Sequence, residues 1–165
     1  MSAITTSSPA AGSDPARSDA PLTGGQVVVF DLGGEEYALP ILRVREVIRY
    51  TPPRRVSGDP RVLGVISLRE RLVPVVDVAQ SLGLEVTPNE NSKIVIVATG
   101  ETSSAGVIVD GVNEVITLRD EEIEPLPVSE TESLGAVAKL GDRLLVMLDA
   151  ERIFDGVDIE TAATE

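Results

Sequence analysis

Residues 71–78 read RLVPVVDV and residues 143–150 read RLLVMLDA, and the two stretches align without a gap 72 residues apart. Two further pairs of segments match in the same chain order: Val44–Ile48 with Val112–Ile116, and Leu63–Val65 with Leu134–Ala136. Three ordered matches at nearly constant spacing predict two related β subdomains. Because a stacked solenoid needs about three repeats, the pattern favours two small barrels with a groove between them.

The composition limits the size of the protein and its chemistry. With 165 residues, 42% of them hydrophobic, the chain makes one domain or two very small ones and can bury a core. That core is aliphatic, because the only aromatic residues are Phe30, Tyr37, Tyr50 and Phe154. Zero Cys excludes disulfides, thiolate nucleophiles and Cys-ligated zinc, and zero His removes the commonest general base and metal ligand.

The charge indicates which partners to expect. A net charge of −13 argues against nucleic acids and anionic membrane surfaces, which attract clustered basic residues. Lys occurs only at positions 93 and 139, so a high-salt cytoplasm and ordinary acidic solubility are both open explanations of the composition. No signal peptide or membrane-spanning run is recognisable, and we expect a soluble, cytoplasmic chain without direct membrane insertion.

Three segments follow from composition and periodicity. Residues 1–25 are rich in Ser, Ala, Pro, Thr and Gly and predict a disordered N-terminal tail. Residues 26–156 carry short β-branched runs punctuated by Gly and Pro, which predict an all-β domain of two pseudo-repeated barrels with little helix. Residues 157–165 are expected to be a flexible C-terminal tail.

The individual strands are predicted from apolar runs and turn residues. The first repeat is expected at 27–32, 35–39, 44–50, 64–68 and 71–76, and the second at 93–99, 105–109, 112–118, 134–140 and 143–148. Gly33-Gly34 and Gly141-Asp142 are expected as tight turns, and Asp59-Pro60 as the start of a very short helix. Asp77 and Asp149 are predicted to cap short helices that end at Gly83 and Gly156.

No motif in the chain predicts a reaction. The acidic residues form no pair with separated environments, and Asp120–Glu124 lacks the spacing of a calcium loop, so we expect a solvated loop there. Alternation in the strand from Val44 predicts that Val44, Glu46 and Ile48 share one face. A carboxylate between two aliphatic residues is expected at an edge or groove. Arg69 and Arg71 flank the next predicted turn.

The ordered series of motifs from about Val27 to Phe154 resembles the CheW family, the coupling proteins of bacterial and archaeal chemotaxis. The resemblance rests on FDLGGEEYALPI at 30–41, VREVI at 44–48, Pro60, GVISLR at 64–69, VPVVD at 73–77, the strand 106–110 and LLVMLD at 144–149. It implies two five-stranded SH3-like barrels around a shared core, with no enzymatic activity and no cofactor.

The resemblance also implies partners and site residues. Family members bridge the histidine kinase CheA, through its regulatory domain, and the cytoplasmic hairpin tip of methyl-accepting chemoreceptors, whose helix enters the groove between the barrels. Val44, Glu46, Gly64 and Arg69 fall at positions tied to receptor coupling. Arg69 would bind carboxylates or carbonyls directionally, Val44 would supply apolar contact, and Gly64 would permit close backbone approach. The kinase-binding residues are not implied.

One position departs from the family pattern. The family usually has Asn-Leu-Arg-Gly where this chain has Ser67-Leu68-Arg69-Glu70. Because Glu does not tolerate positive φ as glycine does, either the turn is reshaped or Glu70 is strained. The Glu70 carboxylate could also compete for Arg69, so Glu70→Gly is expected to tighten receptor binding.

The alternatives differ in output or in class. A CheW-like adaptor could serve a type IV pilus or second-messenger array instead of flagellar chemotaxis. A small-barrel nucleic-acid binder is disfavoured by charge and by the few aromatic residues. A carboxylate-only hydrolase would need a deep pocket holding two close carboxylates.

Overall fold

The computed structural model describes residues 24–56, 58–125 and 134–154. The predicted tail over 1–25 lies outside these residues except for Gly24 and Gly25, and Gly25 already begins the first strand. The predicted C-terminal tail, 157–165, also lies outside them. Within the part described, no helix is long and apolar enough to cross a membrane.

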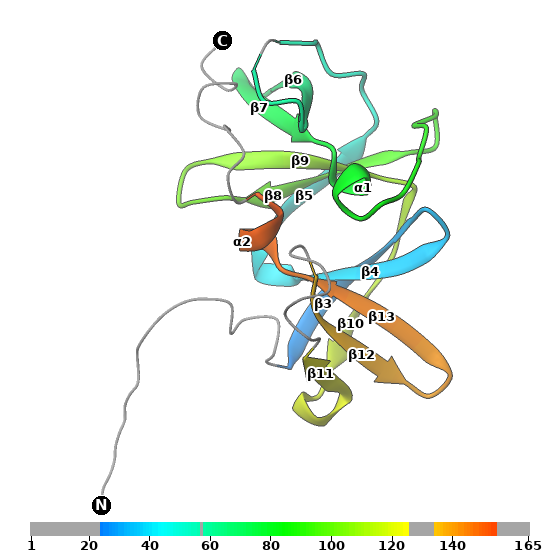
Figure 1. Ribbon diagram of the computed structural model, residues 1–165. Helices are drawn as coiled ribbons and strands as arrows, with labels where there is room; N and C mark the ends of the chain where they lie inside the picture. The colour runs from blue at the N-terminus through cyan, green and yellow to red at the C-terminus, as the bar shows by residue number, and fades with distance from the viewer. Residues whose placement is uncertain (1–23, 57, 126–133, 155–165) are drawn as a thin grey trace, which may run out of the picture.

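Two antiparallel-rich sheets make up the molecule and lie one above the other (Figure 1). The strands are β3 (Gly25–Leu32), β4 (Glu35–Pro40), β5 (Val44–Arg49), β6 (Val62–Leu68), β7 (Arg71–Val76), β8 (Lys93–Ala98), β9 (Ser104–Val109), β10 (Gly111–Leu118), β11 (Ile123–Pro125), β12 (Leu134–Leu140) and β13 (Arg143–Leu148). The helices are η2 (Ile41–Arg43), α1 (Val78–Ser81), η3 (Asp120–Glu122) and α2 (Ala150–Ile153). We call the six-stranded sheet, of order β10-β3-β4-β13-β12-β11, the first barrel, and the five-stranded sheet, of order β5-β8-β9-β7-β6, the second barrel.

The two barrels have the same strand plan. Reading along each sheet, β10-β3-β4-β13-β12 corresponds to β5-β8-β9-β7-β6, and each contains one parallel pair, β13 with β4 and β7 with β9. The predicted pseudo-repeat is therefore confirmed. The assignment of 93–109 to the second repeat was wrong, because β8 and β9 pair with β5 and β7, while the first barrel takes β3 and β4 from the N-terminal end.

The correspondence extends to irregularities in the backbone. The pairing shifts by one residue at Arg45 in β5 and at the equivalent Asn113 in β10. It shifts again at Leu63 in β6 and at Gly135 in β12. A β-bulge bends its strand and redirects the side chains that follow it. The two pairs of equivalent bulges therefore bend corresponding strands of the two barrels at the same points.

Four strands are buried on both faces, which explains their continuous apolar sequences. In β3, β4, β8 and β9, alternate residues enter either the interior of one barrel or a core shared by both. The shared core contains Phe30, Leu32, Tyr37, Leu39, Val76, Val78, Ala79, Val95, Val97, Ala105, Val107, Val109, Leu148, Ala150, Ile153 and Phe154. The two barrels thus form one cooperative unit, with α1 and α2 supplying residues at their junction (Figure 1).

Most predicted turns and caps are confirmed. Gly33 and Gly34 both have positive φ, at 63° and 86°, as a type I′ hairpin turn requires. The Asp77 carboxylate accepts a hydrogen bond from the Gln80 amide at 3.1 Å and caps α1. Gly83 then ends that helix with φ of 76°. The Asp149 carboxylate accepts from the Glu151 amide at 3.1 Å at the start of α2, while Gly156 lies outside the described residues.

Two predictions of local structure were wrong. Asp59-Pro60 begins a turn and not a helix, because the Asp59 carboxylate accepts from the Arg61 amide two residues on, at 2.8 Å, and β6 starts at Val62. Asp120–Glu122 forms the 3-10 helix η3 rather than a solvated loop. There the Glu122 carboxylate folds back to accept from the Arg119 amide at 2.8 Å, and β11 follows at once.

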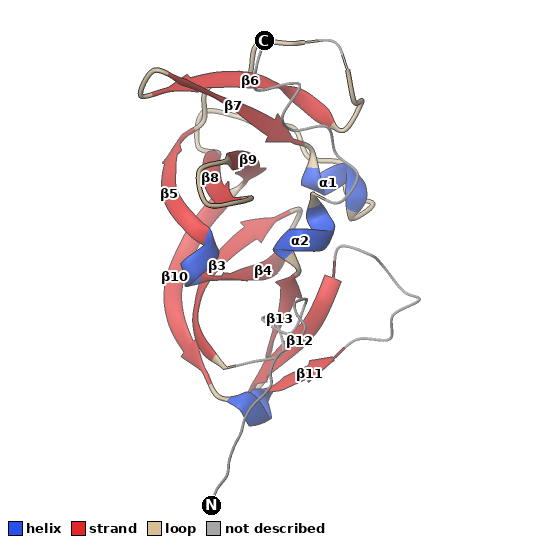
Figure 2. Ribbon diagram, turned by 90° about the vertical axis from the view of Figure 1, so that its left-hand side faces the viewer, coloured by secondary structure: helices blue, strands red, loops and turns tan. Residues whose placement is uncertain are grey.

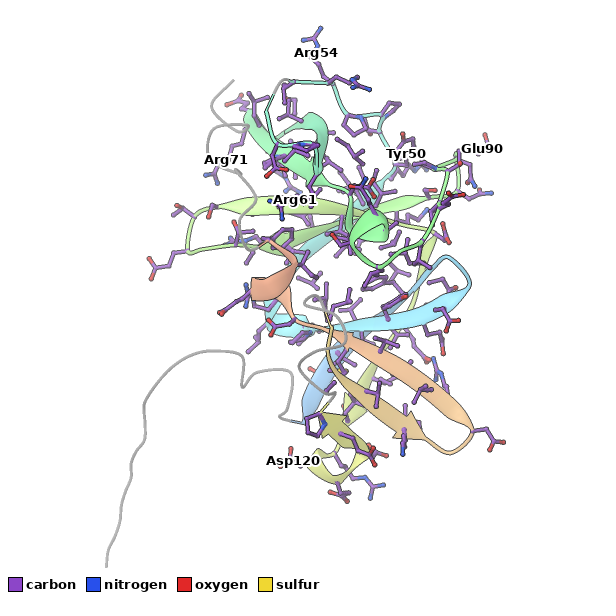
Figure 3. The ribbon with its side chains drawn as sticks, in the orientation of Figure 1. Tyr50, Arg54, Arg61, Arg71, Glu90 and Asp120 are labelled. Carbon is purple, nitrogen blue, oxygen red and sulfur yellow. The ribbon has the colours of Figure 1, made fainter. Side chains whose placement is uncertain are left out.

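Gly64 allows a loop to cross β6. A Cβ at this position would lie 2.3 Å from the Arg54 carbonyl oxygen. The Arg54 amide donates to the Val65 carbonyl at 2.8 Å, and the Val65 amide donates back at 2.9 Å. The expectation that Gly64 permits close backbone approach is confirmed, and its neighbour is this chain's own loop. The Arg54 side chain projects outward (Figure 3).

We expect Gly64→Ala to lower the free energy of unfolding by about 2 kcal/mol, since both hydrogen bonds at the crossing must lengthen. Urea denaturation of the purified protein measures this. Gly111→Ala is the matched control, because a Cβ there meets nothing within 4 Å and its φ needs no glycine. Its stability should be unchanged or up to about 1 kcal/mol higher. Equal stability of the two variants would contradict the packing role of Gly64.

Candidate functional site

The bulge at Arg45 separates two residues that alternation placed together. Val44 pairs with Val97 and packs against the shared core, whereas Glu46 pairs with Ile96, whose side chain belongs to the interior of the second barrel. Ile48 also packs against that interior. The prediction that Val44 shares a face with Glu46 and Ile48 was therefore wrong. Strict alternation fails because the bulge adds one residue to β5.

The turn after β6 aims Arg69 at Glu46. Leu68 pairs with Arg71, which leaves a two-residue turn in which Arg69 and Glu70 have φ of 52° and 70°. Both central residues of a type I′ turn require positive φ, so Glu70 accepts the strained conformation and the turn is not reshaped.

Arg69 and Glu46 form an ion pair across the mouth of the second barrel. The Arg69 Nη1 donates to Glu46 Oε2 at 2.8 Å, with side chains 73% and 23% exposed respectively. This hydrogen bond and the charge of Glu46 raise the pKa of Arg69 above its ordinary value. The carboxylate that competes for Arg69 is thus Glu46 from β5 and not the adjacent Glu70.

A cavity of about 440 Å³ opens beside this ion pair. Its lining includes Arg45, Glu46, Arg71 and Leu72 on strands and Arg69 in the β6–β7 turn. It also includes residues 102–104, where the β8–β9 loop enters β9. Two of its arginines hold that loop in place. The Arg45 guanidinium donates to the carbonyls of Gly100 and Glu101 at 2.7 and 3.0 Å, and Arg71 donates to the Thr102 carbonyl at 2.8 Å. We call this cavity the charged mouth; Figure 3 marks Arg71.

A second, mostly apolar cavity of about 530 Å³, which we call the apolar groove, lies where the chain passes from the first barrel to the second. It is lined by Gly24–Val27, Pro40–Arg43 and Met147, and Leu42 in η2 is 91% exposed beside it. The Arg43 guanidinium fixes η2 by donating to the Ala98 carbonyl at 3.0 Å. Sequence reasoning missed Leu42. The available signal was the apolar pair Ile41-Leu42 directly after Pro40, where the strand ends and an apolar residue can be left exposed.

The first barrel has its own polar cluster at the position equivalent to the charged mouth. Arg143 donates to both carboxylate oxygens of Glu36, at 2.9 and 3.0 Å, and also to Glu114. Asn113 donates to Glu36 at 3.1 Å and to Asp31 at 3.0 Å. The hydrogen bond from Arg143 holds the pKa of Glu36 below its usual value, and the two carboxylates raise the pKa of Arg143.

The structure brings together two of the four residues predicted as a receptor site. Glu46 and Arg69 meet at the charged mouth, while Val44 packs inward and Gly64 supports the Arg54 crossing. Among the residues described, no group of three or more acidic side chains could hold a metal ion. Two linked barrels that present a charged mouth and an apolar groove define a protein-binding module.

Comparisons with known proteins identify the family. Residues 26–158 match the model of the CheW-like domain, so the chain belongs to the CheW-like family. The chemotaxis protein CheW of Bacillus subtilis is 34% identical over 149 residues, covering 87% of this chain and 95% of the relative. The chemotaxis protein CheW of Klebsiella aerogenes is 31% identical over 141 residues, covering 82% of this chain and 85% of the relative.

A solved structure supports the same assignment. The scaffolding protein TtCheW of Thermoanaerobacter tengcongensis superposes with a TM-score of 0.72 at 30% identity, covering 82% of this chain and 95% of that chain. The predicted all-β fold of two SH3-like barrels is confirmed by the two sheets described above and by this match.

We expect Glu36→Gln to flatten the loss of stability at low pH. Because the folded pKa of Glu36 lies below its usual 4.5, its ionised form stabilises the fold above that pH, and this contribution is lost as the pH falls through the folded pKa. In urea denaturation at pH 7 and at acidic pH, the difference between wild type and Glu36→Gln should shrink on acidification. The exposed neighbour variant Glu35→Gln should follow the wild type; identical curves for all three proteins would refute the Glu36 contribution.

We expect Glu70→Gly to raise the free energy of unfolding by about 0.5–1 kcal/mol. Relief of positive φ outweighs the extra chain entropy of glycine in the unfolded state. The equivalent residue Asp142 follows Gly141 and has no positive φ, so Asp142→Gly should be neutral or destabilising. A gain in both variants, measured by thermal and urea denaturation, would point to a cause other than turn strain.

Proposed function

We propose that this protein is a non-catalytic adaptor that couples methyl-accepting chemoreceptors to a CheA-type histidine kinase in chemotaxis signalling. Membership of the CheW-like family supports this role, and so do relatives that are themselves chemotaxis proteins and a structural neighbour that is a scaffolding protein. On this proposal the protein works in the cytoplasm and reaches the membrane only through receptors.

The observation that carries the proposal is an exposed surface along β5 that changes from apolar to charged. η2, β5 and the β6–β7 turn lie along one side of the molecule (Figure 2). Leu42 stands beside the apolar groove at one end, and the Glu46–Arg69 pair stands at the other. Leu42 and Glu46 are four residues apart, which sets an upper limit of roughly 14 Å between their Cα atoms, and η2 and the bulge at Arg45 shorten this. A helix of about nine residues spans that distance and can touch both.

This surface fits the helical tip of a receptor. Helices bind grooves through apolar anchors spaced three and four residues apart, and Leu42 with its groove provides the apolar contact. Arg69 provides directional hydrogen bonds to carboxylates or carbonyls on the same helix. Val44 and Gly64 act indirectly on this proposal: Val44 anchors β5 to the shared core, and Gly64 keeps β6 under its covering loop.

A bridging protein needs a second surface for its second partner. We place the regulatory domain of the kinase on a surface away from η2 and β5, so that receptor and kinase bind at the same time. The pseudo-symmetry of the barrels suits a related two-barrel domain, because equivalent surfaces can then pair. The adaptor proposal therefore predicts that receptor contacts can be removed without loss of the kinase.

We expect Arg69→Glu and Leu42→Asp each to weaken capture of a receptor cytoplasmic hairpin at least tenfold while kinase binding is retained. Arg69→Glu places a carboxylate against Glu46 and removes the donor, and Leu42→Asp puts a charge beside the apolar groove. Purified receptor hairpin and kinase regulatory domain should be tested separately by calorimetry or pull-down.

Lys139→Glu serves as the control, because it reverses one charge in an exposed pair with Glu124 on the first barrel. It should bind the receptor hairpin like the wild type. If the wild-type protein binds neither the hairpin nor the kinase domain, the proposed function is wrong. If both site variants bind the hairpin normally, the β5 surface is not the receptor contact. Glu70→Gly, which removes a negative charge next to Arg69, is expected to bind the hairpin more tightly.

A further inference from the structure

The pseudo-symmetry allows the two polar clusters to be compared position by position. From the strand registers, Glu46 of the second barrel corresponds to Glu114 of the first, and Arg71 corresponds to Arg143. In the neighbouring hairpins, Ala105 pairs with Val97 as Tyr37 pairs with Phe30. Ser104 therefore occupies the position that Glu36 occupies in the first barrel.

The cluster in the first barrel is complete within its own barrel. Arg143 lies between two carboxylates, Glu36 with two hydrogen bonds and Glu114 with one. A guanidinium saturated in this way has few donors left for a partner. The Arg143 side chain is accordingly only 36% exposed. This cluster is a structural ion-pair network.

The equivalent cluster in the second barrel lacks one carboxylate and has two more arginines. Ser104 replaces the carboxylate of Glu36, while Arg45 stands at the position of Asn113 and Arg69 at that of Gly141. Among the described residues, three guanidinium groups and one carboxylate, that of Glu46, line the charged mouth. Glu70 and Glu101 lie on neighbouring turns and do not line it.

The hydrogen bonds of these arginines leave donors unused. Arg71 donates to the Thr102 carbonyl, and in the part of the chain that the structure covers it forms no ion pair. Arg69 gives one donor to Glu46, and a guanidinium has five. A local excess of positive charge is unusual in a chain of net charge −13. It indicates an anionic occupant, and the equivalent cluster shows that a carboxylate fits this geometry.

We propose that the charged mouth binds a glutamate or aspartate side chain of an acidic partner segment, which takes the place that Glu36 fills in the first barrel. Arg71 and Arg69 donate to the incoming carboxylate, and the Ser104 hydroxyl can donate to its second oxygen. Glu46 competes for Arg69 until the partner arrives. This inference rests on the proposed function, because it names the chemistry by which the receptor helix is recognised at Arg69.

The test supplies the missing carboxylate from the protein itself. Ser104→Glu recreates the arrangement of the first barrel and should occupy the arginines. The probe is a helical peptide of about 16 residues with two Glu residues four positions apart, and its twin with Gln at both positions. Titration followed by NMR, observing arginine Nε signals, should show binding of the Glu peptide to wild type and at least tenfold weaker binding to Ser104→Glu.

Controls separate site occupancy from net charge and from misfolding. Thr117→Glu adds the same charge at an exposed position of β10 and should bind the Glu peptide within about twofold of wild type. Arg71→Gln, which removes a guanidinium and adds no carboxylate, should also weaken binding of the Glu peptide at least tenfold. Thermal unfolding of each variant reports whether the fold is retained.

Equal binding of the Glu and Gln peptides, or unchanged binding to both Ser104→Glu and Arg71→Gln, overturns the carboxylate site. If the Glu peptide fails to bind wild type while the receptor hairpin still binds through Arg69, this inference is wrong and the proposed function stands. If the Glu peptide binds as described but neither receptor hairpin nor kinase domain does, the site stands and the adaptor role falls.

Discussion

The structure depends on four strands that must be buried on both faces. In β3 and β8, one set of alternate residues fills a barrel and the other set fills the shared core. Phe30 and Val95, for example, are both fully buried at that shared core. Neither barrel can keep this second face dry alone, so the barrels fold as one body. The relative position of the charged mouth and the apolar groove follows from that requirement.

The directions in which the Glu46 and Arg69 side chains point depend on two irregularities of the second barrel. The bulge at Arg45 turns Glu46 toward the barrel mouth while Val44 stays in the shared core. The strained turn at Arg69 and Glu70 brings the guanidinium back across the mouth to Glu46. Strained backbone persists where the surrounding structure fixes it, and here a hairpin of six paired positions does so. Local strain thereby positions Arg69, the residue proposed to bind the receptor.

The sequence predicts the strands and the repeat, because apolar runs and turn residues act locally. Only the resemblance to the CheW family assigned Glu46 and Arg69 to one surface, where the structure joins them. The sequence does not predict which strands pair, since the placement of β8 beside β5 is decided by long-range burial. Alternation also cannot reveal a bulge, so the face of Val44 was predicted wrongly. Leu42 was missed because its exposure depends on how the two barrels meet at η2.

The shared strand plan of the two barrels separates a structural cluster from the cluster proposed to bind a partner. Two equivalent polar clusters arise from one barrel plan, and the shared core fixes both in place. The first barrel fills its cluster with its own Glu36 and Glu114 around Arg143, which stabilises the fold. The second barrel has Ser104 at the position of Glu36 and arginines at two further positions, so three arginines and one glutamate stand among the described residues that line its mouth. Because the first cluster supports the structure, the second can take the binding role proposed for it without loss of that support.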